Sequence, residues 1–130
     1  MPPVLDPNNL YAADGPGRFS RVVRGFRQLV YVPNSESSSV DVIDPETFRI
    51  VRHFAVGRQP QHVTPSWDLR RLWVGNGQSD SLTPIDPRTG TPGRSVPVQD
   101  PYNLYFTPTA ASRSWSPNGC SGWTSATPIP

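Results

Sequence analysis

The sequence predicts an all-β fold built from a repeated unit, and three observations support this prediction. The 130 residues include 17 prolines and 10 glycines, which interrupt helices and favour turns. Short segments rich in β-branched and aromatic residues recur at close and regular intervals. A longer pattern of such segments, which begins at Val30, returns from Leu72 onward. A bundle of long helices is therefore not expected.

The internal repeat is a unit that is present twice, with the second copy in register behind the first. Self-similarity at a period of about 42 residues indicates an architecture in which each unit buries its apolar face against its neighbours. The matching segments are 30–34 with 72–76, 39–47 with 81–89, and 54–56 with 96–98, followed by 60–63 with 101–104 after a loop that is one residue shorter.

Each copy contains segments with the alternation that is typical of strands. Val40 and Val42 flank Asp41, which predicts a strand with one apolar and one polar side. The second copy departs from this pattern at Pro84, which suits an edge strand or a bulge because proline cannot donate a hydrogen bond. The expected strands are 28–33, 39–44, 49–55, 61–65, 71–75, 81–85, 95–98 and 102–106.

Two segments at equivalent repeat positions have the residue types of a β-turn. Asp44 and Pro45 in the first copy correspond to Asp86 and Pro87 in the second, and we predict that all four are structural turn residues between antiparallel strands. About four short strands in each repeat unit are expected for the four-stranded blades of a β-propeller. The predicted fold is thus a β-propeller fragment of about two four-stranded antiparallel blades.

The chain divides into three expected regions. Residues 1–27 form an irregular lead-in, residues 28–108 hold the two blades, and residues 109–130 form a tail that contains no Leu, Val, Asp or Glu. By comparison with Asp68 in the first copy, an Asp is expected just after residue 108, and none is present. We predict that the tail is disordered, or that it is out-of-frame translation after a one-base shift near codon 109.

The repeats resemble the YVTN-type β-propeller family, which belongs to the WD40/YVTN-like propellers, over residues 29–108. The segment Tyr-Val-Pro-Asn at 31–34 corresponds to the name motif, and further similarity lies at 40–44, 56–63 and 66–68. The resemblance implies a propeller that closes several blades around a channel. Since a propeller needs at least about four blades, the two blades seen here would be part of a truncated or frameshifted propeller.

The resemblance implies a non-enzymatic binding or interaction scaffold as the function. Its partner would be a protein or a small ligand that the sequence does not identify, and exposed blade faces would favour self-association. The alternative is a fragment of a propeller enzyme, such as a lactonase-like hydrolase or a quinoprotein dehydrogenase-like subunit. A third hypothesis is that several copies assemble into a closed ring.

Two histidines, His53 and His62, are the residues best suited to metal binding or proton transfer. Two histidines without a third ligand do not make a metal site, so we expect no metal, no cofactor and no catalytic residue. His62 is the single binding candidate, with a loop-orienting hydrogen bond as the alternative role. Six aromatic residues at repeat positions are expected to pack between blades: Tyr31, Trp67, Trp73, Tyr102, Tyr105 and Phe106.

The charge pattern argues against nucleic acid as a partner. All twelve basic residues are arginines, ten acidic residues are interleaved with them, and the formal net charge is only +2. The arginines at 18, 21, 24 and 27 are expected to be solvated. No run of about 18 apolar residues is present, so no transmembrane segment is expected. The first residues lack the features of a signal peptide, which predicts a cytoplasmic location as written, although a longer parent protein would be secreted or periplasmic.

Overall fold

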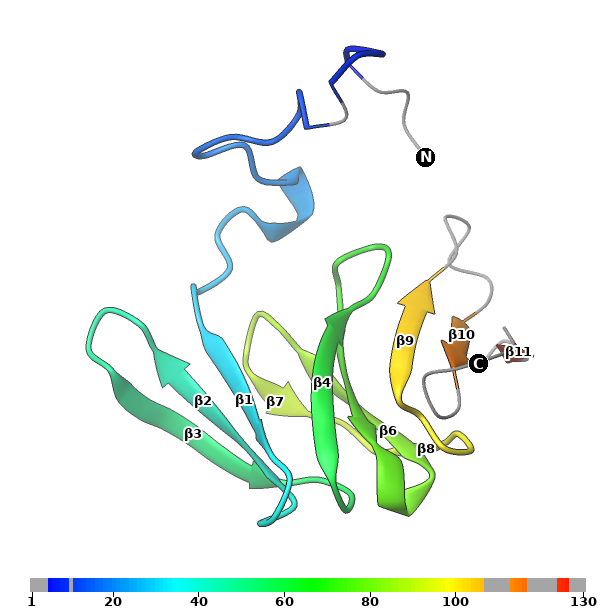
Figure 1. The fold of residues 1–130 in the computed structure, drawn as a ribbon. Coiled ribbons are helices and arrows are strands. Elements are labelled where there is room, and N and C mark those ends of the chain that lie inside the picture. Colours follow the sequence, from blue (N-terminus) through cyan, green and yellow to red (C-terminus); the bar gives the residue numbers. More distant parts are fainter. Residues whose placement is uncertain (1–4, 10, 107–112, 117–123, 127–130) are drawn as a thin grey trace.

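The computed structural model describes residues 5–9, 11–106, 113–116 and 124–126, and antiparallel strands dominate it (Figure 1). The helical elements in this part of the chain are two short 3₁₀ helices, η1 (Arg21–Val23) and η2 (Gly77–Ser79). Neither is long or apolar enough to cross a membrane. The predicted all-β fold is confirmed. The strands are β1 (Val30–Asn34), β2 (Ser39–Asp44), β3 (Arg49–Ala55), β4 (Pro60–Pro65), β5 (Leu72–Asn76), β6 (Ser81–Asp86), β7 (Thr91–Pro92), β8 (Val96–Pro97), β9 (Asn103–Phe106), β10 (Arg113–Ser116) and β11 (Thr124–Ala126).

The strands form three sheets that follow one another along the chain. The first sheet contains β1, β2 and β3, and the second contains β4, β5 and β6, with β7 and β8 both paired to β6. The third contains β9, β10 and β11, of which the last two lie in the predicted tail. The hypothesis that this tail is out of frame stays a prediction. Successive antiparallel sheets packed face to face are the arrangement of propeller blades.

The sequence repeat and the sheets are out of phase by one strand. β4 ends the first sequence copy, but it pairs with β5, so it is the first strand of the second sheet. The connection at 56–59 therefore passes from the first sheet to the second. As a result the first sheet has three strands instead of the expected four. A repeat in sequence shows which segments are equivalent, but it does not show which neighbour each strand pairs with.

Pro84 lies inside the second sheet, which differs from the expected edge or bulge position. It is paired with Trp73 of β5. On the other side of β6, the pairings of β7 and β8 stop on either side of Pro84, and Gly93 N donates a hydrogen bond to its carbonyl oxygen at 2.8 Å. The missing N–H thus splits the outer strand into two short pieces, which explains why the prediction of a single strand at 95–98 was too simple.

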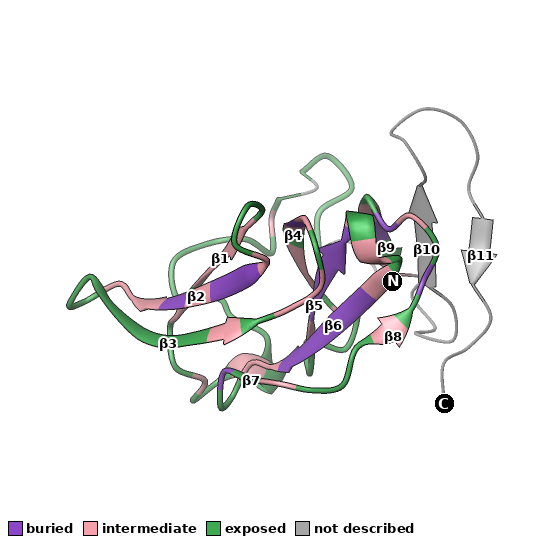
Figure 2. Ribbon diagram, turned by 90° about the horizontal axis from the view of Figure 1, so that it is seen from below, coloured by how far each residue is buried: buried purple, intermediate pink, exposed green. Residues whose placement is uncertain are grey.

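Two apolar clusters hold the sheets together, and Figure 2 shows the buried residues concentrated on β2, β5 and β6. Between the first and second sheets, Val40 packs with Val74 and Ile85. Between the second and third sheets lie Trp73, Leu82, Val98 and Leu104. The second sheet is therefore covered on both faces, because alternate residues of β5 and β6 point to opposite neighbours.

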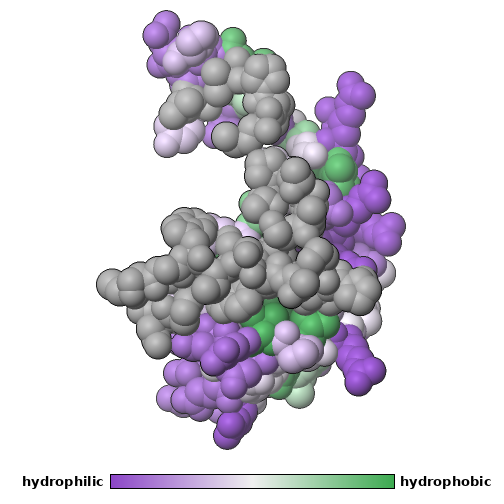
Figure 3. Space-filling view, turned by 90° about the vertical axis from the view of Figure 1, so that its right-hand side faces the viewer, coloured by the Kyte–Doolittle hydropathy of each residue, from purple (hydrophilic) through white to green (hydrophobic). Residues whose placement is uncertain are grey.

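The aromatic residues follow the predicted packing only in part. Trp73 is buried, whereas Trp67, Tyr102 and Tyr105 are 41%, 43% and 51% exposed. The ring of Tyr102 nevertheless meets that of His62 on β4 of the second sheet, so these three side chains are only partly covered and the predicted burial is confirmed for Trp73. Repeat position alone does not reveal whether a side chain points toward a neighbouring sheet. On the side of the molecule shown in Figure 3, a small group of hydrophobic residues is visible in the lower half, with hydrophilic residues beside and below it.

Candidate functional site

A network of three polar side chains crosses the first sheet near its β1–β2 loop. Asn34 on β1 donates from Nδ2 to Asp41 Oδ2 at 2.8 Å, and His53 Nδ1 on β3 lies 2.6 Å from Asp41 Oδ1. These hydrogen bonds, that of His53 first, hold the pKa of Asp41 below its ordinary value. The network borders a hollow of about 540 Å³ that Glu36 and Ser37 also line.

The second sheet has a network at the equivalent repeat positions, but with neutral side chains. Asn76 Nδ2 donates to Thr83 Oγ1 at 2.9 Å, and Thr83 Oγ1 is 2.8 Å from Ser95 Oγ. Thr83 and Ser95 thus occupy the positions of Asp41 and His53. Hydroxyl groups suffice to connect the strands at these positions, so the fold does not require the ionisable pair of the first sheet.

The two networks differ in what covers them. Gly57, in the connection between the first and second sheets, crosses Asn76 so closely that a Cβ atom there would lie 2.7 Å from Asn76 Cβ. Asn76 is fully buried, and its side-chain carbonyl oxygen has no hydrogen-bond partner. Asn34 is only partly buried. The connection between the sheets therefore covers Asn76 in the second sheet, whereas the equivalent Asn34 in the first sheet stays partly accessible.

The uncovered surface of the first sheet is the repeat equivalent of a buried surface. We define the open face as Val30, Val32, Asn34, Asp41 and Ile43. Val30 is 48% exposed, and the other four are partly buried. At the equivalent positions of the second sheet, Val74, Asn76, Thr83 and Ile85 are 0–2% exposed and only Leu72 is partly buried. They are buried because the first sheet packs on them.

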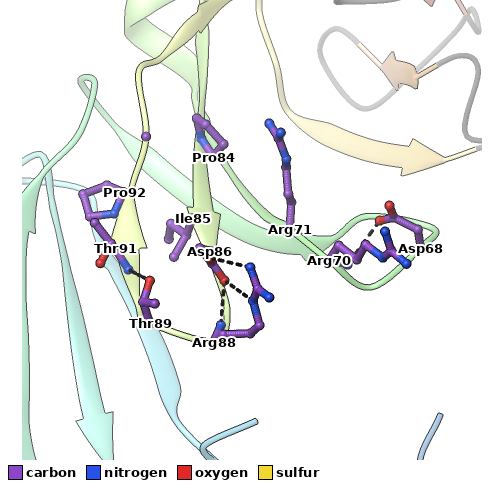
Figure 4. Close-up of a pocket in the computed structure, with 11 residues that line it drawn as sticks. Asp68, Arg70, Arg71, Pro84, Ile85, Asp86, Arg88, Thr89, Thr91 and Pro92 are labelled. Carbon is purple, nitrogen blue, oxygen red and sulfur yellow. Dashed lines mark hydrogen bonds and ion pairs between the residues drawn. The ribbon is translucent and has the colours of Figure 1, made fainter. Parts of the chain in front are cut away.

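A second candidate site is a pocket of about 780 Å³ at the opposite end of the second sheet (Figure 4). It lies between the turn that joins β4 to β5 and the turn that joins β6 to β7. We call it the arginine pocket. Its rim contains charged and hydroxyl side chains and its floor is apolar: Asp68, Arg70, Arg71, Asp86, Arg88, Thr89 and Thr91 form the rim, and Pro84, Ile85, Pro92 and Gly93 the floor.

The two carboxylates of the arginine pocket are occupied by their own turns. Asp68 Oδ1 accepts hydrogen bonds from Ser66 Oγ at 2.6 Å and from Arg70 N at 3.1 Å. Asp86 Oδ1 accepts from Arg88 N at 2.9 Å, and Asp86 Oδ2 pairs with Arg88 Nη2 at 3.3 Å. The bond from Ser66 is the main cause that lowers the pKa of Asp68, and the backbone bond from Arg88 is the main cause for Asp86. Both carboxylates are therefore ionised at neutral pH.

The predicted site residues are found at separate places. His62 is exposed on β4, and its ring meets the edge of the Tyr102 ring at a centroid distance of 5.5 Å. His53 belongs to a different sheet and to the polar network, so the two histidines have different partners. In the part of the chain that the structure describes, no group of three His, Cys, Asp or Glu residues is placed to hold a metal ion.

The predicted turn residues lie in two matching turns. Asp44 Oδ1 accepts a hydrogen bond from Glu46 N at 2.9 Å, as Asp86 does from Arg88 N. Pro45 and Pro87 follow the aspartates in these turns. The sequence prediction missed the polar networks and the arginine pocket. The networks leave a signal in the internal repeat, since Asn34 and Asn76 match, whereas nothing in the spacing of the pocket arginines indicates their proximity.

Comparison with known proteins agrees with the propeller arrangement. A family model for YNCE-like β-propellers matches residues 19–116. Among solved structures, the chain is similar to hydrazine synthase of Kuenenia stuttgartiensis, with 25% identity and a TM-score of 0.59 over 71% of this chain and 26% of that chain. It is also similar to dihydro-heme d1 dehydrogenase NirN in complex with DHE, with 16% identity and a TM-score of 0.58 over 68% of this chain and 19% of that chain. No curated protein matches.

The chain spans about a quarter of the hydrazine synthase chain and about a fifth of the NirN chain. The NirN match concerns the fold alone, since identity is low. Shared propeller folds host many unrelated functions.

Proposed function

Because the chain belongs to the YNCE-like β-propeller family, we propose that it is a non-enzymatic binding scaffold that supplies about two blades of a longer propeller. We further propose that its repeats are of the YVTN type, on the basis of residues 31–34 and the matching positions of the second copy. Its partner would be a protein or a small ligand held by the assembled blades. A closed propeller needs at least about four blades.

The open face is the observation that supports this proposal. Its equivalent in the second sheet is buried by Tyr31, Val40 and Phe54 of the first sheet. A further blade that presents the same kind of apolar side chains would bury Val30 and Ile43 in the same way. Blade stability depends on such interfaces with neighbours, and an unfilled interface leaves it incomplete.

A scaffold role also fits the chemistry of the polar groups. The carboxylates of Asp44, Asp68 and Asp86 are engaged by backbone N–H groups of their own turns. The Asn34 network has a neutral counterpart in the second sheet, and this counterpart connects strands through hydrogen bonds. A structural role therefore accounts for both networks. Side chains that are used to fix turns and connect strands are suited to a rigid support.

The test is to resequence the gene across codon 109 and for several hundred bases on both sides. We expect further copies of the same repeat unit, in this frame or a neighbouring one. An intact frame with no further copies would contradict the proposal. The longer product, expressed with a Val32→Asp substitution on the open face, should then lose stability, whereas Val51→Asp on the exposed part of β3 should be tolerated.

A fragment of a propeller enzyme is the second candidate function. It is favoured by the similarity to hydrazine synthase and to dihydro-heme d1 dehydrogenase, which are enzymes, and by the ionisable Asp41–His53 pair. Replacing this pair by the residues of the second sheet, in Asp41→Thr/His53→Ser, provides a matched variant. If the longer product hydrolyses a lactone, and the variant abolishes the hydrolysis while the protein stays folded, the enzyme hypothesis is supported over the scaffold.

A further inference from the structure

The arginine pocket brings together cations from two turns of one sheet. Arg70 and Arg71 belong to the turn between β4 and β5, and Arg88 belongs to the turn between β6 and β7 (Figure 4). Arg70 and Arg88 also line a second hollow of about 430 Å³, together with Val22 and Phe26 of the lead-in. The positively charged residues of the pocket therefore come from segments that are far apart in the sequence.

The pocket carboxylates leave part of this positive charge available. Asp86 pairs with Arg88, but Asp68 accepts from a hydroxyl and a backbone N–H, and it forms no ion pair within the described residues. Arg70 and Arg71 likewise form no ion pair there. The charge of Arg70 contributes to the lowered pKa of Asp68, and that of Arg71 contributes to the lowered pKa of Asp86. Three guanidinium groups thus line the pocket beside two carboxylates, which leaves it with a net positive charge.

The equivalent turn of the first sheet shows that the fold does not require an arginine here. Glu46 occupies the repeat position that corresponds to Arg88. Its backbone N–H donates to Asp44 in the same way as that of Arg88 donates to Asp86, both at 2.9 Å. The same turn accommodates either charge, so the positive charge in the second sheet is a property of the pocket.

We propose that the arginine pocket binds the phosphate or carboxylate group of a small ligand. Guanidinium groups bind both oxyanions through two parallel hydrogen bonds, and threonine hydroxyls add further donors. Thr89 and Thr91 supply such hydroxyls at the rim, and Ile85 lies in the floor. The volume of about 780 Å³ lies within the range of small-molecule sites.

The test is an NMR titration of the whole chain with pyrophosphate and, separately, with citrate, at ionic strength held constant with sodium chloride. We expect saturable shifts of the amide signals of Arg71, Arg88 and Thr89 with at least one of the two probes. Saturation by pyrophosphate alone identifies a phosphate site, and saturation by citrate alone identifies a carboxylate site. Shifts that do not saturate with either probe would overturn the proposal.

Three variants distinguish a specific site from general attraction to a basic surface. Arg71→Gln removes one cation, and Arg88→Glu copies the turn of the first sheet, so each should weaken binding by about tenfold or more. Arg49→Gln on β3 removes an exposed arginine outside the pocket and should leave the affinity unchanged. Equal weakening by all three would show that only net charge matters. Unchanged signals from β1 and β2 confirm that each variant is folded, and the result does not depend on whether further blades exist.

Discussion

His53 Nδ1 and Asp41 Oδ1 are 2.6 Å apart across β2 and β3, at positions where the second sheet has Ser95 and Thr83. The first sheet thus uses an ionisable pair where its repeat uses two hydroxyls. β3 is an edge strand of the first sheet, and this side-chain pair connects it to β2. The internal repeat also supplies the substitution that removes the ionisable groups and keeps a hydrogen bond between the strands.

Acid should destabilise the protein in part through Asp41. The pKa of Asp41 is lowered in the folded state by His53 and Asn34, so its stabilising contribution is present above the ordinary value of 3.8 and is lost as the pH falls through the lower folded value. The double substitution Asp41→Thr/His53→Ser should therefore reduce the loss of Tm between about pH 6 and about pH 2.5. Thermal unfolding followed by circular dichroism at several pH values measures this loss.

The acid sensitivity should be reduced but not abolished in that variant. Asp68 and Asp86 also have lowered pKa values, and they keep their hydrogen bonds. A useful control is Arg49→Gln, which leaves all three carboxylates in place and should retain the full acid response. An unchanged pH dependence in the double variant would show that the Asp41–His53 pair does not contribute to stability.

Most of the first two sheets was predictable because the strand signals are local. Alternation at Val40 and Val42 and the turn at Asp44 and Pro45 depend on residues that are neighbours in sequence. The strands from β2 to β6 accordingly lie within one residue of their predicted ends. The outer strand was harder, since its split into β7 and β8 depends on Pro84 in a different strand.

The candidate sites were less predictable because they depend on pairing between strands. The approach of His53 to Asp41 requires the register of β2 and β3, which includes an irregularity between Val42 and Ile43. The arginine pocket requires two turns to meet at one end of the second sheet. The spacing of the residues along the chain predicts neither the register of β2 and β3 nor the proximity of the two turns.

Removal of a buried core side chain should strongly destabilise the protein. Leu82 is 1% exposed and packs with Trp73 and Val98 between the second and third sheets. Leu82→Ala should lower the free energy of unfolding by about 2–4 kcal/mol, because it leaves a cavity as well as losing apolar burial. Urea denaturation measures the change. Ile50→Ala on the exposed side of β3 is the control, and a similar loss there would show that burial does not determine the effect.

The stability of the turn between β6 and β7 should depend on the side-chain oxygen of Asp86 that accepts a hydrogen bond. Its Oδ1 accepts a hydrogen bond from Arg88 N at 2.9 Å. Asp86→Ala removes this acceptor and should cost about 0.5–1 kcal/mol, since the turn is close to solvent. Asp86→Asn keeps an oxygen at the same place and should cost less. Urea denaturation of both variants would show whether the acceptor is required, and equal losses would instead implicate the negative charge.

The connection between the first two sheets should tolerate only glycine at position 57. A Cβ atom there would lie 2.7 Å from Asn76 Cβ and 2.8 Å from Ser79 Oγ. Asn76 is fully buried and bonded to Thr83, so it cannot move away without losing that bond. Gly57→Ala should therefore lower the free energy of unfolding by about 1–3 kcal/mol, the usual cost of an overpacked interior.

Gly77→Ala is the matched control for this connection. The nearest atom to a Cβ at position 77 would be Gln59 Oε1 at 3.7 Å, an ordinary contact, so this substitution should change stability little. Thermal unfolding of the two variants side by side isolates the steric effect from the general effect of replacing glycine. If both alanines are tolerated equally, the packing of Gly57 on Asn76 is not what fixes the first sheet against the second. A loss at Gly57 alone identifies this contact as the point where successive blades are joined.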